Sequence, residues 1–157
     1  MAQEDKELLL KDLCARLPYG IKCQFEDTIR ITDGESDPFY DYILFARHLE
    51  LFINHKNFYI KPYLRPMSSM TEEEAKEIAI LHNIKDILSV KVTNDYIDVI
   101  VDDGVCSTET RTIWYDEIIS SIEIFDWLNA HHFDYRGLIP KGLALEAPEG
   151  MYKEEQQ

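Results

Sequence analysis

The stretch ILSVKVTNDYIDVIV, residues 87–101, decides the expected fold. It holds two runs of β-branched and apolar residues, and the polar triplet Thr93-Asn94-Asp95 between them is a turn signal. This pattern predicts a β-hairpin with one face turned toward a core. The side chains expected on that face are Leu88, Val90, Val92, Ile97, Val99 and Val101.

The residues after this hairpin extend it. Asp102-Asp103-Gly104 is a second turn signal, and residues 110–115 have the composition of a third strand that returns alongside the second. We therefore expect a three-stranded antiparallel meander in the C-terminal half of the chain.

Capping boxes predict a helix on each side of the meander. In TEEE, residues 71–74, and in SSIE, residues 120–123, a hydroxyl residue stands three positions before a glutamate. Apolar residues at helical spacing follow each box. The first helix is expected to end near His82 and the second near His131.

The N-terminal half is expected to contain a helix followed by short strands. Apolar residues recur at helical spacing over residues 4–17, and Pro18-Tyr19-Gly20 ends this pattern. The residues expected on the buried stripe are Leu9, Leu10, Leu13, Cys14 and Leu17. The strands expected after it cover residues 21–25, 28–32, 42–46, 50–53 and 58–61, with a turn at Asp33-Gly34.

Prolines divide the chain. Pro62 and Pro66 bracket an expected extended linker, because a proline disfavours helical geometry in the residue before it. We expect residues 1–157 to form a single compact unit that can be divided into subdomains 1–66 and 70–136.

Two similar turns follow the last expected helix. Ile139-Pro140-Lys141-Gly142 and Ala147-Pro148-Glu149-Gly150 both have proline second and glycine fourth, as type I turns favour. They predict an ordered tail, residues 137–152, wrapped on the body. The predicted fold class is α+β, with small antiparallel β-subdomains, namely aromatic-rich N-terminal strands and the C-terminal meander, packed with three helices.

Charge and length exclude several classes of function. The 157 residues carry a formal net charge of −14, and residues 67–136 hold fifteen acidic and five basic residues. This acidity argues against direct binding to nucleic acid or to an anionic membrane, because both need a positive surface. No apolar stretch approaches the roughly 20 residues that span a bilayer, and the polar N-terminus does not resemble a signal peptide.

The three cysteines, Cys14, Cys23 and Cys106, are widely spaced and form no CxxC pair. This usage favours free thiols in a reducing compartment over a disulfide framework or a zinc site. We therefore expect a cytoplasmic protein. For Cys106 a turn cysteine is a simpler interpretation than a nucleophile, since no cysteine-protease signature surrounds it.

Two clusters could be considered as metal sites. His131 and His132 lie near Asp134, but adjacent helical residues point in different directions, so histidines at the negative end of a helix are the simpler interpretation. Scattered positions hold the other histidines, His48, His55 and His82. The carboxylates around the meander lack the spacing of a calcium loop and fit solvated strand faces and turns better: Asp95, Asp98, Asp102, Asp103 and Glu109.

The segment from Phe39 to Tyr63 is the one stretch that resembles a binding face. Its aromatic residues are interleaved with Arg47, Lys56, Lys61 and Arg65, and arginine with exposed rings is typical of protein interface centres and stacking platforms. Most of these rings are expected to fill a small core. One or two exposed tyrosines would remain as anchors for a partner.

Three stretches carry a resemblance: KDLCARLPYG at residues 11–20, KPYLRPMSSMTEEE at 61–74 and YRGLIPKGLALEAPEGMY at 135–152. Together they resemble an uncharacterised family of small proteins encoded by prophages and other mobile elements of gut anaerobes. The resemblance implies no activity, cofactor or catalytic residue. Residues 24–56 and 83–121 fall outside it, and we expect partner specificity to reside there.

The chain contains no GxSxG, P-loop or GxGxxG motif, so no catalytic, cofactor-binding or metal-binding residue is assigned. The first hypothesis is a noncatalytic accessory protein of a prophage or mobile element that acts by binding another protein. The second is an acidic DNA mimic that inhibits a host nuclease or restriction system, suggested by the acidity of residues 67–136. The third is a small metal-dependent hydrolase that uses carboxylates with His131 or His132.

Overall fold

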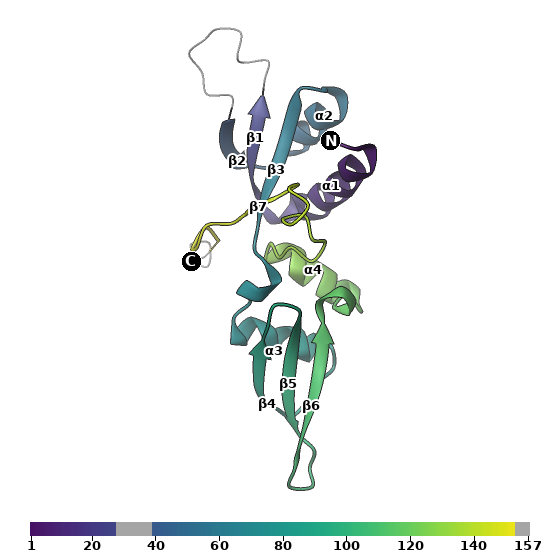
Figure 1. Ribbon diagram of the computed structural model, residues 1–157, viewed down its shortest axis with the longest axis vertical. Coiled ribbons are helices and arrows are strands. Elements are labelled where there is room, and N and C mark those ends of the chain that lie inside the picture. The colour runs from purple at the N-terminus through teal and green to yellow at the C-terminus, as the bar shows by residue number, and fades with distance from the viewer. Residues whose placement is uncertain (28–38, 153–157) are drawn as a thin grey trace. The chain divides into compact units, whose positions relative to one another are not determined.

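The computed structural model describes residues 1–27 and 39–152 (Figure 1). The chain divides into two compact units: unit 1 is Met1–Arg65 with Asn129–Gln157, and unit 2 is Pro66–Leu128. The chain therefore leaves unit 1 after Arg65 and returns to it at Asn129. The strand expected at residues 28–32 and the turn at Asp33-Gly34 lie outside the described residues.

Unit 1 contains helices and one sheet whose strand order is β2-β1-β3-β7. Strand β1 pairs antiparallel with both β2 and β3, whereas β7 pairs with β3 in parallel. The elements are α1 (Gln3–Arg16), β1 (Lys22–Asp27), β2 (Phe39–Ile43), α2 (Ala46–Asn54), β3 (Phe58–Leu64) and β7 (Leu145–Glu146).

Helices α1 and α2 and one sheet face share a single core. Leu9 of α1, Phe52 of α2 and Phe25 of β1 are all buried in it. Cys14, which was expected on the buried stripe of α1, is instead exposed. Its place toward the core is taken by the charged residues Asp12 and Arg16, both fully buried.

Helix α2 corrects the strands expected at residues 42–46 and 50–53. Strand β2 ends at Ile43, and His48, Leu49 and Phe52 are buried at the three- and four-residue spacing of a helix. The aromatic residues just before α2 suggested the alternating pattern of a strand. At this point the chain in fact changes from strand to helical periodicity. The α+β fold class is as predicted, with four α-helices rather than three in the described residues.

Pro62 also departs from the expectation, because it lies inside β3 rather than in a linker. It stands opposite Cys23 of β1, while Cys23 also stands opposite Tyr42 of β2. The bond from the Leu44 N–H to the Ile21 oxygen sets which β1 residues bond to β2, and Cys23 is among them. Pro62 therefore occupies a position that needs no N–H for β1, and the strand continues through it.

The tail of the chain returns to this unit in an ordered conformation. Leu138 and Leu143 are buried in the core, and the Gly142 N–H bonds to the Ile139 oxygen, as the first expected turn requires. The Tyr152 hydroxyl donates to the Tyr63 carbonyl oxygen at 2.8 Å. The last described residues are thereby attached to β3.

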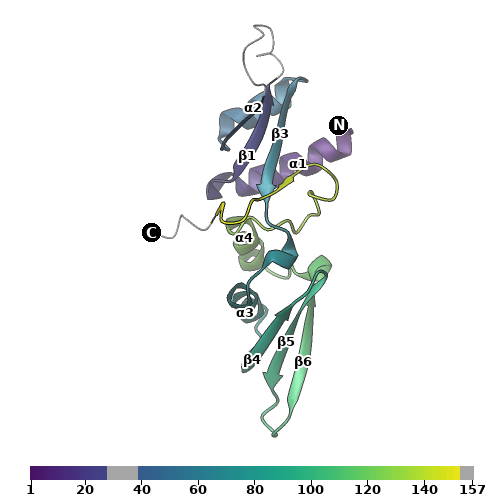
Figure 2. The same cartoon turned by 60° about the vertical axis from the view of Figure 1, so that its left-hand side comes forward.

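Unit 2 is built from a helix and the predicted meander. Its elements are α3 (Glu72–Leu81), β4 (Ile87–Val92), β5 (Tyr96–Asp102), β6 (Thr108–Trp114) and the first residues of α4 (Ile122–Ala130). The three strands form an antiparallel sheet in the order β4-β5-β6. Helix α3 packs on β4 and β5 (Figure 2).

The capping box at Thr71 is present as predicted. The Thr71 hydroxyl accepts from the Glu74 N–H, and the Glu74 carboxylate accepts from the Thr71 N–H at 2.8 Å. The second box is wrong by one residue, because α4 begins at Ile122 and the Ser121 hydroxyl accepts from the Ile124 N–H. Position three of that helix is an isoleucine, which cannot complete a reciprocal box.

Leu88 corrects the expected inner face of the meander. The pairing of β4 with β5 shifts between Ile87 and Ser89, so Leu88 is an extra residue without a partner in the ladder. Its side chain is 55% exposed, whereas Val90 and Val99 are buried as expected. Such a bulge cannot be predicted from a sequence in which apolar residues follow one another, because the extra residue resembles its neighbours.

Candidate binding site

The aromatic segment divides into core residues and exposed residues. Phe52 and Phe58 are buried, but Tyr42 is 57% exposed and Phe45 is 49% exposed. Tyr42 and Phe45 lie on either side of the junction between β2 and α2, with their ring centroids 5.9 Å apart. The sequence identified the aromatic segment, and burial in the fold decides which of its rings are exposed to solvent.

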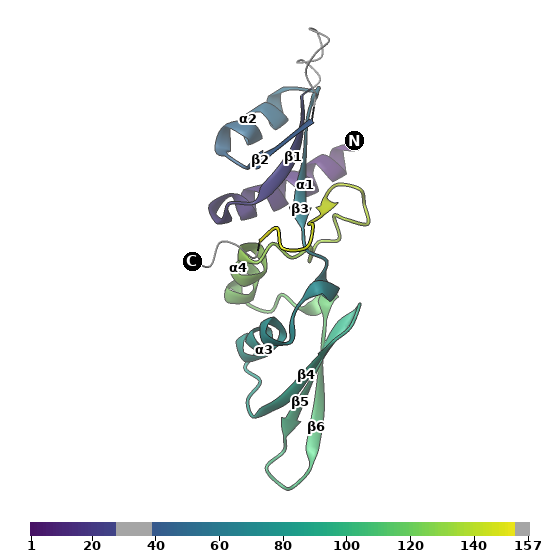
Figure 3. The same ribbon diagram turned by 90° about the vertical axis from the view of Figure 1, so that its left-hand side faces the viewer.

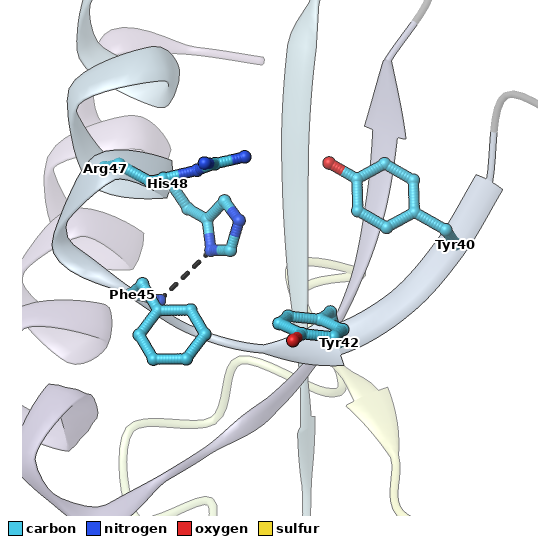
Figure 4. Close-up of a pocket in the computed structure, with 5 residues that line it drawn as sticks. All are labelled: Tyr40, Tyr42, Phe45, Arg47 and His48. Carbon is cyan, nitrogen blue, oxygen red and sulfur yellow. Dashed lines mark hydrogen bonds between the residues drawn. The ribbon is translucent and has the colours of Figure 1, made fainter.

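These two rings line an open pocket of about 380 Å³ (Figure 4). Tyr40 and Tyr42 reach it from the same face of β2, because they are two residues apart. Arg47 and His48 reach it from the first turn of α2, together with Phe45 just before the helix. The short β2–α2 connection thus brings both sets of side chains to one place.

His48 lines this pocket with a neutral imidazole ring whose orientation is fixed by a hydrogen bond. Its Nδ1 accepts a hydrogen bond from the Phe45 N–H at 3.1 Å, so the ring proton resides on Nε2. Its ring centroid lies 4.4 Å from that of the buried Phe25. Burial, and secondly the nearby Arg47 charge, lower the pKa of His48 below its ordinary value. The sequence analysis missed this contact, because a phenylalanine and a histidine three residues apart carry no standard capping signal.

Arg47 is therefore the only charged group among the five described residues that line the pocket. Figure 4 shows its guanidinium directed across the pocket toward the Tyr40 side. The arrangement offers apolar ring surface with one cation at its margin. It contains no pairing of a nucleophile with a base, because the His48 atom that could accept a proton is already bonded to backbone.

Strand β2 also has an open edge beside the pocket. The Leu44 N–H bonds to the Ile21 oxygen, and this fixes the alternation of the ladder with β1. Tyr40 and Tyr42 consequently bond inward, while the backbone groups of Phe39, Asp41 and Ile43 point outward. Within residues 1–27 and 39–152, no strand pairs with that outer edge.

The histidines near residue 131 do not form a metal site with Asp134. The Asp134 carboxylate accepts from the N–H groups of Leu138 and Ile139 at 2.7 and 2.8 Å, so it holds the following turn. The His132 ring is buried, its centroid 4.0 Å from that of Tyr152. Burial is the main cause that lowers the pKa of His132 to about 3. No group of three metal-ligating side chains occurs in the part of the chain that is described.

A buried charged cluster in unit 1 was missed by the sequence analysis. The Arg16 guanidinium donates to both carboxylate oxygens of Asp12, at 2.7 and 3.1 Å, and to the Phe133 carbonyl oxygen at 2.7 Å. Arg136 lies 3.3 Å from the same carboxylate. This cluster joins α1 to the returning segment. Its only sequence signal was the four-residue spacing of Asp12 and Arg16, which also occurs on solvated helices.

The acidic residues of the meander perform local structural roles. Asp98 accepts from the Thr112 hydroxyl at 2.7 Å, and Asp102 accepts from the Gly104 N–H at 2.9 Å. Asp103 accepts from the Ser107 hydroxyl and from the N–H groups of Val105 and Ser107. The hydroxyl bond, and secondly the two N–H bonds, lower the pKa of Asp103. These three carboxylates serve a strand face and a turn, and the DNA-mimic hypothesis gains no support from their hydrogen bonds.

The cysteines are all free thiols, with Cys14 and Cys106 exposed and Cys23 buried. Burial raises the pKa of the Cys23 thiol, which makes it inert. Cys106 lies in the β5–β6 turn with a left-handed φ of 66°. None of the helices described for this chain is both long enough and apolar enough to cross a membrane.

Comparisons with known proteins supply no relative from which a role for the pocket could be transferred. No family model, curated protein or solved structure matches the chain. The arrangement of Tyr42, Phe45 and Arg47 beside an open strand edge is therefore interpreted from its own chemistry.

Proposed function

We propose that this chain is a noncatalytic accessory protein of a prophage or mobile element, and that it acts in the cytoplasm by binding another protein at the β2–α2 pocket. The observation that carries the proposal is the pair of exposed rings, Tyr42 and Phe45, next to Arg47 at an open strand edge. Tyrosine and arginine are the residues on which interface energy most often depends. The resemblance of the terminal and central stretches supports the mobile-element context, and the free thiols support a reducing compartment.

The bound segment is extended. Asp41 and Ile43 present outward-facing backbone groups, so an extended peptide can add to the sheet as a further strand. Alternate side chains of such a strand point to the same face as Tyr40 and Tyr42. One of them, apolar or aromatic, then enters the pocket between the rings.

The same segment carries an acidic residue near the one that enters the pocket. Arg47 is the single cation among the described residues that line the pocket, and a carboxylate can accept two parallel hydrogen bonds from a guanidinium. Basic peptides would be attracted by the net charge of −14 without any fixed position, whereas an acidic side chain has one defined place to bind. The partner therefore contains an acidic, apolar strand-forming segment and is not nucleic acid.

The binding mode is tested with a random peptide library displayed on phage and selected on the purified protein. The wild-type protein should enrich peptides with alternating apolar residues and one acidic position. Arg47→Glu should lose the acidic preference and exchange it for a basic one, while Lys85→Glu, an exposed charge change in unit 2, should keep the wild-type motif. Absence of any enriched motif, or an unchanged motif with Arg47→Glu, would contradict the proposal.

The accessory role is tested in the native host. A tagged wild-type chain and a tagged Arg47→Glu chain are expressed at equal levels, and the proteins captured with each are compared after nuclease treatment. A stoichiometric partner that contains the selected motif and is lost with Arg47→Glu is the expected result. Turnover of a defined substrate by the purified protein, abolished by changing one polar residue, would overturn the noncatalytic role.

A further inference from the structure

Strand β6 of unit 2 is exposed on both faces and along one edge. Of its residues only Ile113 is buried, at 7% exposure. Helix α3 packs against β4 and β5 and leaves the third strand uncovered (Figure 3). In the described residues the sheet ends at β6, so the outer edge of this strand has no partner.

The backbone groups that face this open edge can be identified. The Tyr115 N–H bonds to the Asp95 oxygen, and the Asp103 N–H bonds to the Ser107 oxygen. Both bonds belong to the same continuous register of β5 and β6. Because bonded and non-bonded pairs alternate in an antiparallel ladder, residues 109, 111 and 113 bond inward to β5. The residues whose backbone N–H and C=O groups point outward are Thr108, Thr110 and Thr112.

The side chains of the intervening residues carry opposite charges. Glu109 and Arg111 lie on the same face of β6, with side chains about half exposed and a distance of 3.5 Å between their charged groups. An exposed pair of this kind contributes little to the stability of a single chain. Its arrangement matters because the sequence Thr-Glu-Thr-Arg-Thr is complementary to itself when reversed.

We propose that β6 pairs antiparallel with β6 of a second copy of this chain, around a two-fold axis through Thr110. Thr110 then bonds to Thr110 of the other copy, and Thr108 bonds to its Thr112. Glu109 stands opposite Arg111 of the other copy in a non-bonded pair, where side chains are closest. The two meanders form one continuous six-stranded sheet, and each arginine lies between two glutamates.

Charge selects this register from its neighbours. An axis through Glu109 would place that carboxylate opposite its own copy, and an axis through Arg111 would do the same with two guanidinium groups. Like charges directly opposite each other destabilise a strand pair. The axis through Thr110 is the one in which both residues meet an opposite charge, and it uses all three outward-facing threonines.

The association is expected to be modest in strength. Two short strand edges bury less area than a standard interface, and each copy carries a net charge of −14. Dimerisation should therefore depend on protein concentration and strengthen as salt screens the overall repulsion. The proposal concerns unit 2 only and does not rest on the binding function proposed for the β2–α2 pocket.

The test is sedimentation velocity with charge-reversed variants across a range of concentrations. Arg111→Glu gives two carboxylates and Glu109→Arg gives two guanidinium groups on the strand, so each variant alone should dimerise roughly tenfold more weakly or worse. An equimolar mixture of the two should restore association, because every carboxylate then faces a guanidinium. The double variant Glu109→Arg with Arg111→Glu should dimerise like the wild type.

Two further variants distinguish the edge from the overall charge. Lys91→Glu changes an exposed charge on β4, at the other side of the sheet, and should leave dimerisation as in the wild type. Thr110→Pro removes an N–H that β5 does not use, so the meander should remain folded by circular dichroism while dimerisation is lost.

Hydrogen exchange locates the contact. The amides of Thr108, Thr110 and Thr112 should exchange more slowly as the concentration of wild-type protein rises. In the Thr110→Pro variant, the amides of Thr108 and Thr112 should show no such dependence on concentration. A wild-type chain that stays monomeric at several hundred micromolar in moderate salt would overturn the proposal. So would association that survives Arg111→Glu, or a mixture of the two single variants that remains monomeric.

Discussion

Strands β2 and β6 each form an open sheet edge, but they present different chemistry to a partner. Beside β2 lie exposed rings and one guanidinium, and the outward-facing residues are Phe39, Asp41 and Ile43. Along β6 the outward-facing residues are all threonine and the side chains between them alternate in charge. Both edges offer the same backbone hydrogen bonds, so side chains decide which strand can pair with each.

The difference lies in self-complementarity. If β2 paired with its own copy through all three outward-facing residues, Asp41 would stand opposite Asp41, and the like charges would oppose the contact. The β6 edge places opposite charges together under the same operation. The side chains of one edge thus favour a different chain, and those of the other favour a second copy of the same chain.

The largest expected effect comes from breaking the buried ion pair of unit 1, the unit that contains the β2 edge. Asp12→Ala leaves the fully buried Arg16 without its carboxylate and should destabilise unit 1 by about 3–5 kcal/mol. Because both tryptophans, Trp114 and Trp127, lie in unit 2, fluorescence during urea unfolding reports that unit separately. Methyl NMR signals of Leu9 and Leu13 report unit 1.

In this variant the unit 1 transition should move to lower urea while the fluorescence transition stays in place. The exposed neighbour Lys11→Ala should change neither by more than about 0.5 kcal/mol. Equal shifts of both transitions with Asp12→Ala would mean that the two edges share one cooperative structure.

Acid should also act mainly on unit 1. Burial lowers the pKa of His132 to about 3, so this ring stays neutral in the folded chain while the unfolded chain takes up a proton below about pH 6.5. The free energy of unfolding should therefore fall by about 1.4 kcal/mol per pH unit between these values and be unaffected above them. The lowered pKa of His48 adds to this slope in unit 1, while the raised pKa of Asp134 opposes it at the acidic end.

The measurement is urea unfolding from pH 7 to pH 4 with the same two reporters. Unit 2 contains one described histidine whose pKa is lowered by burial, His82, so its slope should be smaller. His132→Asn is the matched variant, because asparagine tolerates the left-handed φ of 60° at this position. It should remove most of the unit 1 slope; a slope that is unchanged would assign the acid sensitivity to other groups.

A pair of charge reversals should separate the two edges directly. Arg47→Glu should weaken peptide binding by roughly tenfold and leave dimerisation unchanged, because a guanidinium–carboxylate contact contributes about 1.5 kcal/mol or more. Arg111→Glu should have the reverse effect. Both activities are measured on the same samples, by fluorescence anisotropy of a selected peptide and by sedimentation. Loss of both activities in either variant would show that the edges are not independent.

The smallest effect is expected at the helix that supports the meander. Thr71→Ala removes the hydroxyl that accepts from the Glu74 N–H and should lower the stability of unit 2 by about 1 kcal/mol. The tryptophan fluorescence transition should shift accordingly, and peptide binding should not change. Ser68→Ala, at an exposed position before the helix, is the control.

Most elements that depend on contacts between residues close in sequence were predicted, whereas features that depend on contacts between distant residues were not. The meander and the Thr71 capping box depend on neighbours in the chain, and both were predicted from sequence. Helix α2 was predicted as strand because Phe45 and His48 make a cap from residue types that carry no standard capping signal. The bulge at Leu88 depends on pairing between strands and cannot be seen in either strand alone.

The site was predictable only as a region. The sequence indicated that rings and arginine between Phe39 and Tyr63 could form a binding face, but burial decides which of them are available. The buried contacts of Arg16 with Phe133 join residues 117 positions apart, and no local pattern announces such a pair. The self-complementary order of Glu109 and Arg111 was present in the sequence and became meaningful once β6 was known to be an edge.

The return of the chain to unit 1 at Asn129 has a consequence for synthesis on the ribosome. Residues 1–65 leave the ribosome first, but Phe133, which accepts from Arg16, and β7, which pairs with β3, follow only after all of unit 2 has been made. At roughly 5–20 residues per second, the incomplete first unit waits several seconds for them. During that interval Asp12 and Arg16 lack their later partners, while unit 2 can already fold. A message truncated after residue 128 would therefore yield all the strands of unit 2, while unit 1 would lack β7 and the carbonyl oxygen that accepts from Arg16.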